Sequence, residues 1–269
     1  MRCYFFGDIH GNTYALEKCL AHMEEIQADR VYCLGDLVGW LPFGDRTLIR
    51  MRALDLPTVA GNHDLLVAGL FPDHPNQIDR MQASAYNAGL LSTVPGAVDY
   101  LLSLPLTLEG EDYVVVHHSP FHLPPAGEQP NINCFNYLDE AALASVLDSW
   151  RVYPKRFIFS GHDHDPAIYE LPAGESPNVN RYHPAPLESL TLHLEPGSRY
   201  WIKAGSVGGP YRDGAAVANS ALYDSETETL TLFRLPYPVA QLYRELGSER
   251  FSCNLPTIQG YWRLLRDFL

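Results

Sequence analysis

Five short blocks of the sequence combine glycine or valine with aspartate, asparagine or histidine, the side chains that bind metal ions and move protons. They are G-D-I-H-G-N at residues 7–12, G-D-L-V-G at 35–39, G-N-H-D at 61–64, V-H-H-S-P at 116–120 and G-H-D-H at 161–164. Imidazole nitrogens suit Zn, Fe, Mn, Ni or Co, whereas carboxylate and amide oxygens suit harder ions, and a carboxylate can bridge two of them. One such block would be a weak signal, but five together predict a site for divalent cations.

A pair of such cations has a well-defined chemistry. Two ions roughly 3.5–4 Å apart can activate a water molecule and neutralise the charge that grows on a phosphoryl group during in-line displacement. Phosphoryl transfer depends above all on positioning and on charge stabilisation. The residue types therefore favour hydrolysis of a phosphate ester.

Each block follows an apolar, strand-like run, which explains how residues far apart in the chain can meet. Apolar runs at 3–6, 31–34 and 58–60 alternate with helical patterns at 12–27 and 47–54, a β-α-β-α-β order. Parallel strands are expected from this order, with ligands at their carboxyl ends. Asp8, Asp36 and Asn62 should then lie at one edge of the sheet, where glycines permit tight turns.

The rest of the chain predicts further helices and strands. Residues 77–104, 138–150, 239–246 and 258–269 have helical patterns, and 113–116 and 157–159 are buried-strand candidates. Strand-like runs at 168–171, 190–194, 200–203, 216–223 and 230–233 suggest an antiparallel sheet in the second half. We predict an α/β sandwich of two mixed β-sheets packed face to face and flanked by helices. We expect a single domain, 1–269, with 236–269 as a C-terminal helical extension.

Composition narrows the possible partners and the location. A formal net charge of -13 argues against a nucleic-acid or anionic-membrane partner, since either needs a basic face. No apolar run resembles a signal peptide or a membrane span, so we expect a cytoplasmic protein. The five cysteines include no C-x-x-C pair, and Cys3, Cys19 and Cys33 lie in apolar patterns typical of core residues.

The five blocks, in this order, resemble the motifs of the calcineurin-like metallophosphoesterase superfamily over residues 1 to about 235. This resemblance implies a four-layer sandwich and two divalent cations, whose identity among Mn, Fe, Zn, Ni and Co stays open. It implies that one ion is bound by Asp8, His10 and His164, that Asp36 bridges, and that the second ion is bound by Asn62, His117 and His162. By the same resemblance Asn62 and His63 contact the substrate phosphate. His63 protonates the leaving group as general acid, and Asp64 orients it.

Two segments resemble a branch of small bacterial phosphodiesterases: residues 35–39 and the later G-S-V-G at 205–208. This chain departs from that branch at Lys203-Ala204, where Asn-Pro is usual, and at residues 209–212, where the arginine is shifted by one position. Arg212 is therefore a candidate substrate contact only. His118 replaces the usual Gly or Ala and is expected either to touch substrate or to pack at the rim.

The function predicted is a dinuclear-metal-dependent phosphodiesterase that cleaves a small phosphate ester through a metal-bridging hydroxide. A phosphomonoesterase and a dinucleoside-polyphosphate hydrolase remain alternatives, and a non-catalytic scaffold of the same fold is disfavoured because every ligand position is filled. A serine/threonine phosphatase is disfavoured because the D-R-G continuation typical of that group does not follow at Asp36. A purple acid phosphatase is disfavoured because Gly39 stands where that group has a tyrosine ligand. The terminal helix bearing Tyr261, Leu264 and Phe268 either covers the core or faces a second subunit in a homo-oligomer.

Overall fold

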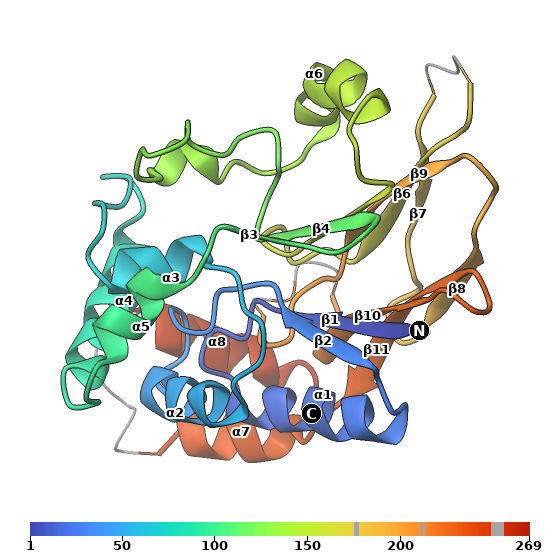
Figure 1. The fold of residues 1–269 in the computed structure, drawn as a ribbon. Coiled ribbons are helices and arrows are strands. Elements are labelled where there is room, and N and C mark those ends of the chain that lie inside the picture. The colour runs from blue at the N-terminus through green and yellow to red at the C-terminus, as the bar shows by residue number, and fades with distance from the viewer. Residues whose placement is uncertain (175–177, 210, 212–213, 249–255) are drawn as a thin grey trace.

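Two mixed β-sheets lie face to face in the computed structural model, which describes residues 1–174, 178–209, 211, 214–248 and 256–269 (Figure 1). The first sheet has the order β2-β1-β10-β11-β8 and the second β3-β4-β5-β9-β6-β7. Strands β1 and β2 are parallel, as are β4, β5 and β9, and the other pairs are antiparallel. The strand bounds are β1 (Arg2–Phe6), β2 (Arg30–Cys33), β3 (Thr107–Glu109), β4 (Tyr113–Val116), β5 (Phe157–Ser160), β6 (Ala167–Leu171), β7 (Asn180–Tyr182), β8 (Leu190–His193), β9 (Arg199–Lys203), β10 (Val217–Asp224) and β11 (Thr229–Pro236).

The side chains of a buried strand alternate between the two faces of its sheet, and this explains why the sheets stack. In β1, Cys3 and Phe5 belong to the core between the two sheets, while Tyr4 and Phe6 belong to the core between the first sheet and the helices that cover it. Successive side chains of a strand point to opposite faces, so a strand that is apolar throughout needs cover on both sides. Phe5 stacks on Phe159 of the other sheet with ring centroids 3.7 Å apart.

Helices cover the two outer faces and complete four layers. Helices α1 (Thr13–Glu25), α2 (Gly44–Leu54), α7 (Val239–Leu246) and α8 (Pro256–Arg266) lie below the first sheet in Figure 1, and α6 (Glu140–Arg151) lies above the second. Trp150 of α6 packs edge-on against Trp201 of β9. Helices α3 (Asn62–Val67), α4 (Ile78–Leu91) and α5 (Ala97–Ser103) gather beside the sheets, and Ile132–Cys134 forms a short 3-10 helix. The predicted sandwich of mixed sheets and helices is confirmed.

Two details of the predicted topology are wrong. Residues 58–60 do not form a strand of the sheet but make one parallel bridge, between Thr58 and Cys33, because the chain turns into α3 directly after Gly61. The strands of the second half do not form a sheet of their own: β10 and β11 extend the first sheet beside β1, and β9 pairs in parallel with β5. Apolar patterning indicates that a strand is buried, but not which strand is its neighbour.

The C-terminal helix covers the core of this chain. Ile258, Tyr261 and Leu265 are buried in the cluster beneath the first sheet, and Phe268 packs against the same cluster. Of the predicted alternatives for this helix, packing against the core is therefore observed. None of the helices in the described ranges combines the length and hydropathy that crossing a membrane requires.

Candidate metal centre and active site

The predicted ligand side chains meet at one edge of the two sheets. All except Asn62, the first residue of α3, come from the loops that follow four strands. Asp8 follows β1, Asp36 follows β2, His117 follows β4 and His162 follows β5. Every predicted metal ligand is buried, and the most exposed of them, His162, has a relative accessibility of 6%. Such a concentration of buried polar groups requires partners, because an unpaired polar group in the interior is costly.

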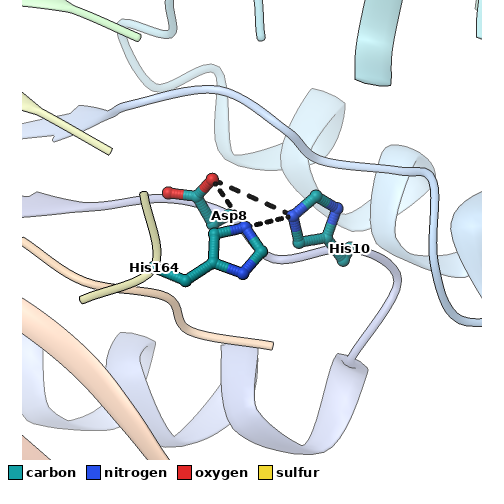
Figure 2. Close-up of side chains that lie close together, drawn as sticks. All are labelled: Asp8, His10 and His164. Carbon is teal, nitrogen blue, oxygen red and sulfur yellow. Dashed lines mark hydrogen bonds and ion pairs between the residues drawn. The ribbon is translucent and has the colours of Figure 1, made fainter. Parts of the chain in front are cut away.

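Asp8, His10 and His164 form the first group of converging side chains (Figure 2). The Nε2 atoms of the two histidines lie 3.0 Å apart. Asp8 Oδ1 lies 3.3 Å from Nε2 of His164 and 3.9 Å from Nε2 of His10. Three donor atoms from the beginning and the middle of the chain thus face one small volume.

The second group consists of Asn62, His117 and His162. Asn62 Oδ1 lies 3.1 Å from His117 Nε2 and 2.9 Å from His162 Nδ1. The backbone carbonyl of Leu34 lies 2.7 Å from His117 Nδ1, which leaves Nε2 directed at the centre. Nε2 of His162 is buried without a hydrogen-bond partner among the described residues.

Asp36 lies between the two groups and is in reach of both. Its Oδ2 atom is 3.6 Å from His10 Nε2 and 3.3 Å from His117 Nε2. Its Oδ1 atom accepts a hydrogen bond of 2.8 Å from the backbone N–H of His63. One carboxylate oxygen therefore faces a histidine from each group.

The donor set and its protonation fit divalent cations. Burial lowers the pKa of His10 and of His162 well below the ordinary histidine value, so both are neutral near pH 7 and offer nitrogen lone pairs. Although burial opposes both shifts, the interaction of His117 with Asp36 holds the pKa of Asp36 well below its usual range and raises that of His117 to about 10. Asp36 is therefore ionised, and His117 must release its proton to bind an ion. Neutral imidazoles and ionised carboxylates are the forms that bind metals. The residues present therefore fit divalent cations.

The backbone of the centre adopts a left-handed conformation that residues other than glycine rarely adopt. Among the described non-glycine residues with positive φ, five are ligand candidates: Asp8 (51°), His10 (50°), Asp36 (53°), His162 (68°) and His164 (62°). A left-handed residue costs on the order of 1 kcal/mol or more, and such strain concentrates at functional sites. The surrounding fold therefore stabilises a strained loop set that aims these side chains inward.

Gly161 is required by close approach and gives a first prediction. A Cβ atom at this position would lie 2.3 Å from Asp8 Oδ2, whereas one at Gly89 in α4 would meet nothing within 4 Å. We expect Gly161→Ala to displace Asp8 and to weaken metal binding by about 10- to 100-fold, as other changes that misplace a ligand do. Metal titration by calorimetry measures this, with Gly89→Ala as control. Equal affinity in both variants would contradict the placement of Asp8.

His63 lies at the open side of the centre. Its ring packs edge-on against His10, with centroids 4.7 Å apart, and at a tilt against Trp40, with centroids 5.2 Å apart. Burial lowers its pKa to about 4, which Asp36 opposes and the positive charge of Arg80 reinforces. Its Nδ1 atom is buried and has no hydrogen-bond partner in the described parts of the chain.

The expected contact between Asp64 and the His63 ring is absent from the described structure, so the predicted orienting role is corrected. The Asp64 carboxylate instead accepts hydrogen bonds from the backbone N–H groups of Asp36 and Leu37, both at 2.8 Å, and of Gly61 at 3.1 Å. Adjacent residues of α3 point in directions about 100° apart, so Asp64 cannot face the same way as His63. It holds the loop that carries Asp36.

His118 and Arg212 are the two remaining candidates for contact with the substrate. His118 does not sit at an open rim: it is buried, its ring packs edge-on against His162 with centroids 5.2 Å apart, and burial lowers its pKa to about 3. It also lines a separate small pocket with Ser119 and Phe135. Arg212 lies outside the described residues.

A small cleft opens onto the centre and includes residues that the sequence did not predict. Arg80 of α4 and Tyr137 line it together with Trp40, His63 and the ligand candidates. Tyr137 stacks on His162 with ring centroids 5.1 Å apart. Neither Arg80 nor Tyr137 follows a strand or belongs to a glycine-containing block, so no sequence signal marked them.

The later glycine-serine segment supports the first ligand loop. Ser206 donates a hydrogen bond of 2.9 Å from Oγ to the Asp8 carbonyl, which also accepts one of 2.9 Å from the N–H of Gly208. Tyr261 of α8 donates to the carbonyl of Gly208. The C-terminal helix is thereby connected to the loop of Asp8.

Comparisons with known proteins agree with this geometry. Residues 1–215 match the model of the calcineurin-like phosphoesterase superfamily domain. An uncharacterised protein of Methanocaldococcus jannaschii is 27% identical over 248 residues, which is 91% of each chain. The crystal structure of a metallophosphoesterase from Sphaerobacter thermophilus is similar with a TM-score of 0.72 and 27% identity, covering 97% of this chain and 98% of that one. A hypothetical protein from Pyrococcus horikoshii shares the fold with a TM-score of 0.62 and 19% identity, over 96% of each chain.

Fold and site together define a hydrolase that acts on phosphoric esters. The chain belongs to the calcineurin-like phosphoesterase superfamily.

Proposed function

We propose that this protein is a phosphodiesterase that hydrolyses a small phosphate ester with the help of two divalent cations. The position of Asp36 carries this proposal, because one of its oxygens faces histidines of both ligand groups, at 3.6 and 3.3 Å. A carboxylate shared in this way is suited to link two ions.

Each of the two ligand groups would bind one ion. Asp8, His10 and His164 would hold one ion, Asn62, His117 and His162 the other, and Asp36 would contact both. When bound, such ions supply Lewis-acid stabilisation of a phosphoryl group and generate a nucleophile from water. The proposed ligands are buried and several of them line the cleft, so the substrate phosphate would approach them through it.

His63 is placed to act on the leaving group. It lines the cleft beside Asp36 and Asn62, and its Nδ1 atom makes no hydrogen bond to another described residue. Because burial lowers its pKa, the protonated ring needs a nearby anion, and a bound phosphate is such an anion. We propose that His63 donates its proton to the departing oxygen of the ester.

A phosphomonoesterase and a dinucleoside-polyphosphate hydrolase use the same chemistry and differ only in what flanks the phosphate. A scaffold without catalytic activity is disfavoured, since each proposed ligand position holds a side chain of the required type.

The test is a substrate and metal profile on purified protein whose metal content has been measured. We expect chelation to abolish hydrolysis of bis-p-nitrophenyl phosphate, and Mn, Co or Ni to restore it. The diester should be cleaved with a higher kcat/KM than p-nitrophenyl phosphate or a dinucleoside polyphosphate. Activity that survives complete removal of metal would refute the proposal, and a preference for either other substrate would replace the diesterase assignment.

A further inference from the structure

The cleft at the metal centre contains one guanidinium whose role the strand-end residues do not explain. Among the described residues that line this cleft, Arg80 is the only lysine or arginine. Its side chain is 14% exposed and comes from α4, close to the beginning of that helix. A positive side chain at the entrance of a phosphoesterase cleft suggests an anion as its partner.

Asp73 fixes the guanidinium without using all of it. Arg80 donates a hydrogen bond of 2.7 Å from Nε to Asp73 Oδ2, and a second one from Nη2 to Oδ1. Asp73 is itself almost fully buried, with 3% of its side chain exposed. A guanidinium has five N–H donors in one plane, so a carboxylate on the Nε side leaves the N–H groups of its far end available. That end matches two oxygens of a phosphate.

The segment that carries this pair is anchored against another segment of the cleft. Phe71, two residues before Asp73, stacks on Phe135 with ring centroids 6.3 Å apart. Tyr137, two residues beyond Phe135, lines the cleft and stacks on His162. Asp73, on a segment that the Phe71–Phe135 contact anchors, therefore holds Arg80 in place before any substrate binds. Such preorganisation reduces the entropy lost on binding.

A purely structural ion pair is the competing explanation. The chain contains such a pair at Arg50 and Glu17, which are joined by hydrogen bonds of 2.8 and 3.2 Å on the outer surface. Both side chains there are largely exposed, at 43% and 55%. The Asp73–Arg80 pair has the same two-bond geometry, but its side chains are only 14% (Arg80) and 3% (Asp73) exposed and Arg80 lines the cleft at the metal centre.

We infer that Arg80, oriented by Asp73, binds an anionic oxygen of the substrate phosphate through the free end of its guanidinium. The inference rests on the proposed function for its substrate, but it concerns phosphate binding and not the chemical step. It makes Arg80 a specificity residue for the charged phosphate, and Asp73 a positioning residue that acts through Arg80.

The test measures binding of inorganic phosphate to Mn-loaded protein by calorimetry, so that no turnover is needed. We expect Arg80→Gln to weaken phosphate binding by about 10- to 100-fold, the size expected for hydrogen bonds to a charged group. Arg50→Gln should bind phosphate like the wild type, and Asp73→Asn should show a smaller loss than Arg80→Gln. Metal content should be equal in all four proteins.

A second variant separates recognition from folding. Added guanidinium ion should partly restore phosphate binding to Arg80→Ala, whereas a structural defect would not respond to it. Phosphate affinity in Arg80→Gln within twofold of the wild type would overturn the inference, as would an equal loss in Arg50→Gln or no binding by the wild type. Phosphate binding that depends on Arg80 in a protein that cleaves no phosphate ester would uphold the inference and refute the proposed function.

Discussion

Asp36→Asn is expected to lower kcat/KM for phosphodiester hydrolysis by about 10³-fold, since loss of metal-ion stabilisation costs several kcal/mol of transition-state energy. An asparagine has the same shape, and its carbonyl oxygen can still accept the 2.8 Å hydrogen bond from the N–H of His63. It lacks the negative charge that both ligand groups share. The fold should persist while the centre loses affinity for at least one ion.

The measurement combines steady-state kinetics with metal content after dialysis against limiting Mn. Asp55→Asn is the matched control, because Asp55 has nearly the same left-handed backbone, with φ of 50° against 53° for Asp36, but is exposed. Wild-type activity and two bound ions in Asp36→Asn would show that Asp36 does not link the groups. Thermal unfolding of both variants without metal checks that the fold is intact.

The second large effect is expected for His63→Gln, which should reduce kcat by roughly 10²- to 10⁴-fold on esters with a poor leaving group, the usual contribution of a general acid. The reduction should be much smaller for p-nitrophenyl esters, whose leaving group departs without a proton. Metal content should not change, because the ligand groups proposed above do not need this ring.

The pH dependence of the same variant gives an independent check. His63 must be protonated to donate, so activity that depends on it is lost as pH rises through its pKa. Burial lowers that pKa to about 4 in the metal-free protein, which moves this loss toward acid pH, and the bound phosphate must raise it again. We expect an alkaline limb in the kcat profile of the wild type that is absent from His63→Gln. His183→Gln, an exposed histidine paired with Asp165, is the control. An unchanged profile in His63→Gln would rule out the general-acid role.

The ligand candidates were accessible from sequence for a simple physical reason. A side chain that must reach a metal at the edge of a parallel sheet follows a strand, and Asp8, Asp36, His117 and His162 all do so. The turns that aim them depend on glycine at fixed places, as at Gly161, where the atom nearest an added Cβ belongs to Asp8. Both requirements are local, so they leave a visible pattern.

Contacts between distant segments left no such pattern. Apolar runs indicated that β9, β10 and β11 exist but not that they would complete both sheets, because strand partners are selected by packing across the whole molecule. The direction of Asp64 away from His63 follows from the helical turn of α3 and from the loop of Asp36 that lies within its reach.

The sequence by itself was enough to predict the family and the layered class of fold and to mark the strand-end ligand candidates, since these depend on residue types and their spacing. The tertiary structure alone decided that Asp36 faces both groups, that Asp64 holds a loop, and that Arg80 reaches the cleft from α4. The reason is geometric: a distance between side chains from separate elements depends on how those elements pack, and no single segment contains that information.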